Sequence, residues 1–467
     1  MNGDATPQDL EESLYEVRKK IHPRAVTGLF ARWRVAMVLL TQAVFYGGPW
    51  LVWDHRQAVL FDLVHRKFYI FGLVLWPQDF IFLTGLLIIS AYALFLFTAI
   101  AGRLWCGYAC PQTVYTEIFL WVERQVEGDR TKRLALDRAP LSLEKVLRRG
   151  TRHILWIVIA LWTGFTFVGF FTPIRELMGE IATNALGPWE TFWILFYAFA
   201  TWGNAGYMRE QVCKYMCPYA RFQSAMFDPD TLIVTYDAQR GEPRGGRSRN
   251  TDYRAAGLGT CVDCGICVQV CPTGIDIRKG LQYECIACSA CIDACDQVMD
   301  RMNYPRGLIR NTSENVLNGV VAERDKFRRM LRPRTMIYAS VLLLLVGAFV
   351  AALVMRVPVR LNVMRDRAVI YRLTEEGLVE NVYRLQVMNM RDAPRFFDLK
   401  VNGLDGATLR RVKLPLEIGP LATETLPVDV DVDPNAITEN RTEIQFVLTA
   451  TDDPGVTVSS KSQFFGR

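Results

Sequence analysis

Residues 261–295 read CVDCGICVQVCPTGIDIRKGLQYECIACSACIDAC and contain two cysteine runs of identical spacing. In each run, two residues separate the first three cysteines, and the fourth follows after three more residues. Bacterial-type ferredoxins hold two [4Fe–4S] clusters with this spacing, and the fourth cysteine of each run binds the other cluster. We therefore expect one cluster on Cys261, Cys264, Cys267 and Cys295, and a second on Cys285, Cys288, Cys291 and Cys271.

Zinc is the main competing metal, because paired C-x2-C units also form tetrahedral sites. A zinc site takes four ligands and would leave the regular third and fourth cysteines of each run without a role. The spacing therefore favours iron–sulfur clusters. Pro272 follows the first run but Asp296 follows the second, so we expect a more polar pocket around the cluster that uses Cys295.

Five uninterrupted apolar runs lie between charged residues, although 22% of the 467 residues are charged. Each run is close to the roughly 17–25 residues that a helix needs to cross a bilayer. Buried helices of a large soluble protein are the alternative, but flanking charges at every run argue against it. We expect five transmembrane helices at residues 35–53, 80–102, 154–174, 191–208 and 335–355. The shorter run 68–76 is expected to be an interfacial or re-entrant segment.

Lys and Arg counts in the connecting segments predict the orientation, because cytoplasmic loops are enriched in both. Residues 103–153 carry ten and residues 209–334 carry nineteen, whereas residues 54–79 carry three and residues 175–190 carry one. This places the N-terminus and all twelve cysteines in the cytoplasm, where thiols stay reduced. The net charge of +6 is thus a topology signal, and we expect no nucleic-acid partner.

The predicted domains follow from this topology. They are a cytoplasmic N-terminal arm (1–34), a four-helix membrane domain (35–208) with a cytoplasmic loop (103–153), a cytoplasmic segment (209–334) containing a ferredoxin-like α+β insert (255–305), a fifth transmembrane helix (335–355) and a periplasmic domain (356–467).

The predicted periplasmic domain has a different residue pattern. Apolar and polar residues alternate at 383–387 and 428–432 and more loosely at 443–448, which indicates half-buried strands. Turn signals such as Asn402-Gly403 and Asp433-Pro434 separate the strands. The pattern predicts an all-β sandwich of immunoglobulin-like type. This domain contains no His or Cys, so we expect it to dock a partner rather than to catalyse.

The remaining four cysteines form two matched C-x-Y-x-C-P motifs, at residues 106–111 and 213–218. In a helix, cysteines at i and i+4 share one face. Parallel repeats related by a pseudo-twofold axis would also bring the two motifs together. We therefore expect a catalytic redox centre formed by Cys106, Cys110, Cys213 and Cys217. Its chemistry is open between an Fe–S cluster, a copper site and a dithiol pair, and reduced structural thiols are the non-functional alternative.

Other residues near the motifs are weaker candidates for ligands. His153 opens the third apolar run, and Met208, Met216 and Met226 flank the second motif. Thioethers suit Cu(I), although Met at a membrane edge more often packs against its neighbours.

The combined layout resembles the CcoG family, also called FixG or RdxA. The resemblance rests on five apolar runs, two C-x-Y-x-C-P motifs, a two-cluster loop before the last run and an all-β tail, and it covers essentially the whole chain. The stretch Trp105–Thr113, WCGYACPQT, is especially similar. NapH and NosR membrane ferredoxins share the paired motifs but not the whole layout. The resemblance implies a bacterial inner-membrane accessory factor that reduces Cu(II) to Cu(I) for assembly of cbb3-type cytochrome c oxidase.

The mechanism that we expect is a one-electron relay from a cytoplasmic donor, through the ferredoxin clusters, to Cu(II) at the four-thiol site. Thiolates favour Cu(I), so such a site both promotes reduction and holds the product. The implied partners are membrane lipid, a cytoplasmic or quinol electron donor, the copper ion and the subunits or assembly factors of the oxidase. Two alternatives are a quinol-linked carrier that feeds another reductase, as the NapH likeness suggests, and a non-catalytic assembly scaffold.

Overall fold

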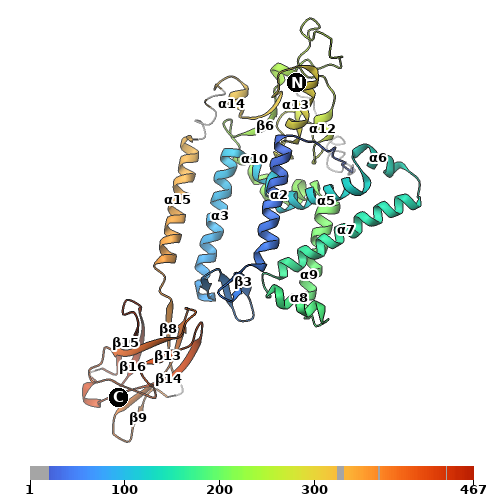
Figure 1. The fold of residues 1–467 in the computed structure, drawn as a ribbon. Coiled ribbons are helices and arrows are strands. Elements are labelled where there is room, and N and C mark those ends of the chain that lie inside the picture. Colours follow the sequence, from blue (N-terminus) through green and yellow to red (C-terminus); the bar gives the residue numbers. More distant parts are fainter. Residues whose placement is uncertain (1–19, 323–324, 326–330, 367–368, 438, 467) are drawn as a thin grey trace, which may run out of the picture. The chain divides into compact units, whose positions relative to one another are not determined.

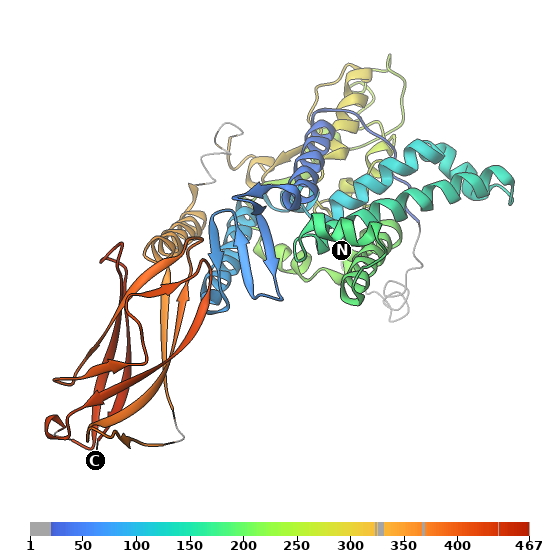
Figure 2. The same ribbon diagram turned by 60° about the horizontal axis from the view of Figure 1, so that its bottom comes forward.

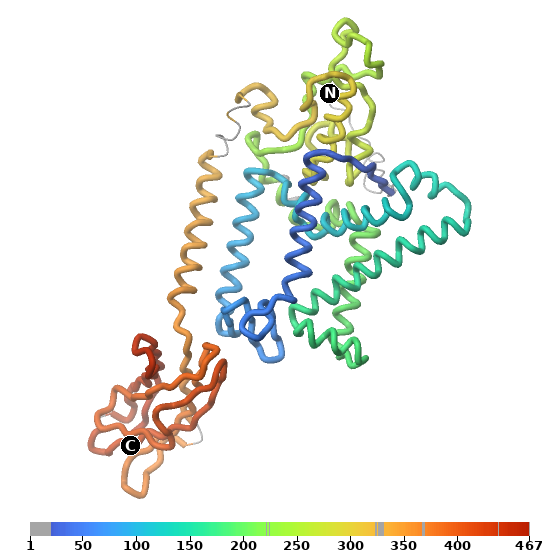
Figure 3. Tube along the Cα trace, viewed as in Figure 1, coloured from blue at the N-terminus to red at the C-terminus, as the bar shows by residue number. Residues whose placement is uncertain are grey.

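Helices dominate the first three quarters of the chain and strands the last quarter, as the residue patterns predict. The structure is a computed structural model that describes residues 20–322, 325, 331–366, 369–437 and 439–466. The chain divides into two compact units, residues 1–346 and 347–467. Figures 1 and 3 trace the elements of each unit.

The predicted apolar runs are largely helical. They form α2 (Leu29–Gly47), α3 (Phe80–Ala101), α7 (Leu143–Val168), α9 (Pro188–Thr201), which the π-helix η3 (Trp202–Met208) extends, and α15 (Pro333–Val354). Three stretches, Pro77–Ala101, Leu143–Val168 and Pro333–Val354, are long and apolar enough to cross a membrane. Helices α2 and α9 do not meet that description, so five transmembrane helices stay a prediction.

Helix ends differ from the predicted spans where local chemistry overrides the charge pattern. Helix α2 ends at Gly47 rather than at 53, because Pro49 in the next turn, η1 (Gly48–Trp50), has no N–H to donate. Helix α7 begins at Leu143 rather than at 154, since the Ser142 side chain caps it by accepting a hydrogen bond from the Lys145 N–H. Charged residues in the first turns of a helix do not end it.

Residues 52–75 form two small antiparallel sheets. Strand β1 (Val52–Trp53) pairs with β2 (Arg56–Gln57), while β3 (Val59–Asp62), β4 (Lys67–Ile70) and β5 (Leu73–Leu75) form a three-stranded sheet. The run 68–76, predicted as an interfacial or re-entrant segment, is therefore mostly two strands. Its apolar side chains alternate across a sheet rather than circling a helix.

Shorter helices connect the long ones. They are η2 (Pro77–Asp79), α4 (Leu104–Tyr108), α5 (Pro111–Glu127), α6 (Arg130–Arg138), α8 (Ile174–Ala182), the π-helix η4 (Val212–Met216) and α10 (Pro218–Met226). Helix α7 packs on both α5 and α9, and α5 also packs on η3. Gly164 permits the closest approach, because a Cβ there would meet the Ile194 carbonyl oxygen of α9 at 2.3 Å.

The ferredoxin-like part is small and mixed, as predicted. It contains α11 (Ala238–Gly241), α12 (Ile266–Gln269), η5 (Ile277–Lys279), α13 (Ala290–Met302), α14 (Glu314–Leu317) and the antiparallel pair β6 (Ile233–Tyr236) and β7 (Ile309–Thr312). Val234 of β6 and Leu308 beside β7 share its apolar core, so the folded part extends beyond the predicted limits 255–305.

A carboxylate of α13 connects the ferredoxin-like part to the start of α2 through hydrogen bonds. The two oxygens of Asp293 accept hydrogen bonds from the backbone N–H groups of Phe30 at 3.2 Å and Ala31 at 2.7 Å. Acidic groups at a helix N-terminus stabilise it, because its first N–H groups have no partner within the helix.

The second unit is a two-layer β-sandwich (Figure 2). One sheet has the order β12 (Thr408–Arg410), β14 (Thr423–Val432), β10 (Val379–Asn389) and β8 (Val359–Arg365), with β9 (Arg372–Leu373) also on β10; the other has the order β13 (Leu416–Ile418), β11 (Arg395–Asn402), β15 (Arg441–Ala450) and β16 (Thr457–Phe465), and η8 (Pro434–Ala436) is a connecting turn. All three predicted strands are confirmed. Their inward side chains, such as Tyr383, Val430 and Phe446, form one buried core.

Candidate functional site

The structure gathers the eight ferredoxin-type cysteines into two groups. The first group lines one small cavity and consists of Cys261, Cys264, Cys267 and Cys295. Burial raises the pKa of the Cys295 thiol to about 12, and the charges of Cys267 and Asp296 contribute next. Crossed ligation requires this grouping, and four thiols around one cavity fit a [4Fe–4S] cluster.

Cys271 belongs to the second group. The other three thiols of this group belong to Cys285, Cys288 and Cys291. Burial raises the pKa of each, and the charge of Cys271 raises it further. In the described part of the chain, no three His, Cys, Asp or Glu side chains are placed to hold one metal ion. A four-iron cluster does not require several side chains to meet at one metal ion, because each thiolate binds a different iron.

The two cysteine runs share a backbone conformation as well as a spacing. Asp263 and Gly265 have φ values of +50° and +64°, and Ala287 and Ser289, at the same offsets in the second run, have +53° and +59°. Non-glycine residues adopt this left-handed conformation rarely and at some cost. Its recurrence at matched positions indicates that each loop is shaped to aim its thiols at a common centre.

Asp296 occupies the place where the first run has Pro272. Without a proline, helix α13 continues through this position to Met302, and the Asp296 carboxylate accepts a hydrogen bond from the Gly307 N–H at 2.9 Å. A charged group therefore lies next to Cys295, as the sequence predicts.

The four thiols of the C-x-Y-x-C-P motifs also come together. Burial raises the pKa of Cys213 to about 12, and the charges of Cys110, Cys106 and Cys217 follow as causes. The Cys106 thiol donates a hydrogen bond to the side-chain oxygen of Gln223 at 3.4 Å. Gln223 lies on α10, the helix that follows the second motif, so this contact joins the two motifs.

The two cysteines of each motif do not lie on one continuous helix, so the shared helical face considered from the sequence does not apply. Cys106 is in α4 and Cys213 in η4, but Cys110 and Cys217 have extended backbones and cap α5 and α10. A residue before proline avoids the helical region, and proline itself suits the first position of a helix. The two motifs nevertheless repeat one local structure: a short helical turn, an extended cysteine and a new helix.

The first motif lies directly on the second cysteine group. A Cβ on Gly107 would meet the Ile286 carbonyl oxygen at 2.7 Å and the Cys288 N and Cα atoms at 2.9 Å. Cys213 and Cys288 also line one small pocket. The four-thiol site and the second cluster site are therefore neighbours.

Arg103 links these two sites and was not predicted from the sequence. Its guanidinium is 4% exposed and donates hydrogen bonds to the carbonyl oxygens of Tyr283 and Ala220. The Arg103 charge lowers the pKa of Cys106 and of Cys285, although burial outweighs it and both pKa values are raised. A fixed positive charge thus lies near a thiol of each site. Only its position just before the motif could have suggested this role.

His153 and Met216, two of the weaker candidates, have other surroundings. His153 accepts a hydrogen bond from Arg152 at 2.8 Å and stacks on Tyr207, with ring centroids 5.9 Å apart. The Met216 side chain is 56% exposed. Tyr215 of the second motif is exposed as well, whereas Tyr108, at the same position of the first motif, is half-buried.

Several curated proteins match this chain along most of its length. Nitrogen fixation protein FixG of Rhizobium meliloti is 38% identical over 456 residues, which cover 91% of this chain and 86% of FixG. Protein RdxA of Cereibacter sphaeroides is 42% identical over 409 residues, or 85% of each chain. This chain belongs to the FixG/RdxA family. Protein RdxB of the same organism is 38% identical, over 91% of this chain and 89% of RdxB.

Family models divide this FixG-family chain as the structure does. A 4Fe-4S dicluster domain matches residues 208–314, a 4Fe-4S binding domain matches residues 83–127, and the immunoglobulin-like fold at the C-terminus of FixG matches residues 349–467. The chain is thus an iron–sulfur electron-transfer protein. A crystal structure of a FixG-related protein from Vibrio parahaemolyticus is 29% identical, covers 24% of this chain and 97% of that one, and has a TM-score of 0.22.

Proposed function

We propose that this FixG-family protein reduces Cu(II) to Cu(I) for assembly of a cbb3-type cytochrome c oxidase. The observation that carries the proposal is the position of the four-thiol site against the backbone of Cys288. A site of soft ligands next to an electron carrier suits one-electron reduction of a soft-metal substrate.

The proposed location is the bacterial inner membrane, with α2, α3, α7, α9–η3 and α15 as spans. The N-terminus and ferredoxin-like part then lie in the cytoplasm, and residues 356–467 lie in the periplasm. The contrast of ten and nineteen Lys and Arg residues against three and one supports this orientation. Three helices with the length and apolar character of a span support the location.

The two clusters, when bound by the eight ferredoxin-type cysteines, supply one-electron redox chemistry. Cys264 of the first group is exposed, which suits electron entry from a cytoplasmic donor at that end. The backbone of the second cysteine group, at Ile286 and Cys288, lies within contact distance of Gly107 in the first motif. Each Cu(II) substrate ion gains one electron from the donor and leaves as Cu(I).

The four-thiol site is suited to binding copper as it is reduced. Burial raises the pKa of Cys106 to about 11, so its free thiol is protonated at neutral pH. A bound metal ion displaces that proton, because the thiolate is the ligand. The resulting sulfur ligands favour Cu(I) over Cu(II), which helps to drive the reduction.

A third Fe–S cluster on the same four thiols is the second candidate. The 4Fe-4S binding domain matched at residues 83–127 includes Cys106 and Cys110, and this observation favours it. In that case the ferredoxin-type clusters and the third centre would form one chain of carriers. A quinol-linked carrier and a non-catalytic scaffold have no comparable observation in their favour.

The test uses full-length protein with its ferredoxin clusters reduced beforehand, to which Cu(II) is added anaerobically. Single Cys106→Ser and Cys213→Ser variants should each lose most of the reduction rate. The double variant should lose little more, because groups that act as a unit are not additive. Met216→Leu, which changes an exposed sulfur beside the motif, is the control and should keep the rate. Full rates in both serine variants would refute the site.

Iron analysis separates copper from a third cluster. Two clusters correspond to about eight iron atoms per chain and three clusters to about twelve. Replacing all four motif cysteines by serine should leave the iron content unchanged if the site takes copper. A loss of about four iron atoms would assign it to a third cluster instead.

A further inference from the structure

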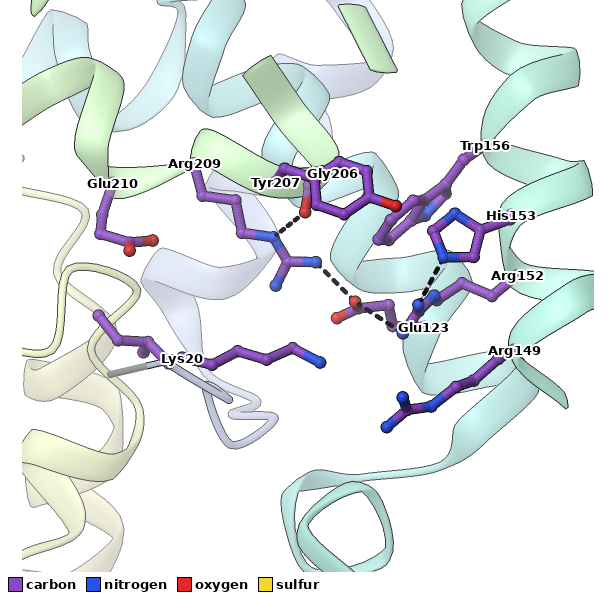
Figure 4. A pocket seen from close by; sticks show the side chains of 11 residues that line it. Lys20, Glu123, Arg149, Arg152, His153, Trp156, Gly206, Tyr207, Arg209 and Glu210 are labelled. Atoms are coloured by element: carbon purple, nitrogen blue, oxygen red, sulfur yellow. Dashed lines mark hydrogen bonds and ion pairs between the residues drawn. The ribbon is translucent and has the colours of Figure 1, made fainter. Parts of the chain in front are cut away.

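A cavity of about 400 Å³ lies beside the four-thiol site and has no role in the proposed reduction. Its walls come from α5, α7, η3 and the segment before α2 (Figure 4). Arg209 and Glu210 line both this cavity and the small pocket that contains Cys213 and Cys288. A ligand here would therefore bind close to the redox centre.

Basic side chains dominate the cavity. Its charged lining consists of Lys20, Arg149, Arg152, Arg209, Glu123 and Glu210. The ion-paired neighbours of these groups are Arg133, Glu127 and Asp137. Among the described residues, these groups amount to five cations and four carboxylates, so basic groups outnumber acidic ones. His153 is not counted among the cations, because its Nε2 accepts a hydrogen bond from Arg152 at 2.8 Å and so carries no proton.

Arg209 lines the cavity and is 7% exposed. Its Nε donates to the Gly206 carbonyl oxygen at 2.9 Å and one Nη donates to Glu123 at 2.5 Å. The other Nη is buried without a hydrogen-bond partner. Figure 4 shows the ends of Lys20, Arg149 and Arg209 pointing toward one another across the cavity. A buried guanidinium donor without a partner is costly, so this geometry calls for an oxygen acceptor.

The Trp156 side chain offers little free surface to a ligand in this cavity. Trp156 is 2% exposed and stacks on Phe119, with ring centroids 5.0 Å apart. The guanidinium groups of Arg152 and Arg209 lie 4.8 Å and 5.6 Å from its ring. The Trp156 ring is thus already in contact with other groups, whereas one Nη of Arg209 is left to donate to an anion.

We propose that this cavity binds the phosphodiester of an anionic phospholipid headgroup. The excess of basic groups among the described lining residues suits the negative charge of a phosphodiester, and forked guanidinium donors match phosphate oxygens. Arg149 and Arg152 lie at the start of the apolar stretch of α7, which is long enough to span a bilayer. Basic pockets at the cytoplasmic ends of such helices bind anionic headgroups. The inference rests on the membrane location in the proposed function but not on copper reduction.

The test is native mass spectrometry of full-length protein in detergent, with phosphatidylglycerol or phosphatidylcholine added. The protein should retain phosphatidylglycerol in preference to phosphatidylcholine. Arg149→Ala should weaken that retention about fivefold, the effect of one cation near a lipid phosphate. Arg209→Lys should weaken it too, because one ammonium cannot serve Gly206, Glu123 and the lipid together. Arg148→Ala is the matched control, since Arg148 pairs with Glu144 and does not line the cavity.

Several outcomes would overturn the inference. They are equal retention of the two lipids, or equal effects of Arg148→Ala and Arg149→Ala. Binding of inorganic phosphate that depends on Arg149, without any lipid preference, would identify a free anion as the ligand and exclude the lipid. Cu(II) reduction measured on the same samples keeps the two proposals apart, because lipid retention requires neither copper nor electron transfer.

Discussion

Replacing Gly107 by alanine tests whether the ferredoxin-like part rests on the first thiol motif. Gly107 is buried and helical, so alanine suits its backbone, and any cost must come from the added methyl group. That methyl would meet three backbone atoms of residues 286 and 288 at 2.7–2.9 Å. Backbone atoms in a cluster-binding loop cannot turn aside as a flexible side chain can.

The size of the effect follows from this overlap. Ordinary contacts begin near 3.4 Å, so the loop must retreat by about 0.7 Å or the helix must shift by the same amount. Overpacking of this kind costs roughly 1–3 kcal/mol. Each kcal/mol lowers a melting temperature by about 2–4 °C in a domain of 150–250 residues. We expect Gly107→Ala to lower the temperature at which the iron–sulfur absorbance is lost by roughly 2–12 °C.

The assay follows that absorbance during heating under anaerobic conditions. Gly179→Ala is the control, because a Cβ at this exposed position in α8 would meet nothing within 4 Å and alanine favours a helix. The control should melt at or above the wild-type temperature. An unchanged melting temperature and an unchanged cluster EPR spectrum in Gly107→Ala would refute the docking of the loop on this motif.

Three further predictions concern the hydrogen bonds from Asp293 to α2, the cysteine ligands of the clusters and the membrane topology. Asp293→Ala removes two hydrogen bonds to the start of α2 and should destabilise the unit of residues 1–346 by about 1 kcal/mol. Amide exchange should become faster in the first turn of α2, and unchanged exchange would contradict the capping role. Cys271→Ser should give the same EPR spectrum as Cys288→Ser, and a spectrum that shows loss of the other cluster would contradict crossed ligation. Alkaline phosphatase should be active when fused after residue 467 and inactive when fused near residue 250, and the reverse result would invert the topology.

The elements that the sequence predicts well depend on short-range patterns. The spacing of Cys261 to Cys295 is a local pattern with a known geometry, and Cys295 lies with Cys261, Cys264 and Cys267 around one cavity. Alternation at 428–432 likewise corresponds to a strand, because one face of that strand is buried in the sandwich core.

The features that the sequence does not reveal depend on contacts between distant residues. Glu123 forms ion pairs with Arg133, Arg152 and Arg209, and the last lies 86 residues away along the chain. Each looks like an ordinary surface charge until the helices pack. The start of α7 is different, since Ser142 before Leu143 is a local capping signal that a search for uncharged runs overlooks.

The cap on α2 has a consequence for how the protein is made. Ala31 and its acceptor Asp293 are 262 residues apart, so the ribosome completes the helix long before it adds the group that caps it. At roughly 5–20 residues per second, the delay is about 13–50 s. Asp293 also lies between Cys291 and Cys295, so its position depends on a folded ferredoxin segment. A newly made chain without iron would therefore keep a frayed first helix, which proteases that remove immature chains can attack.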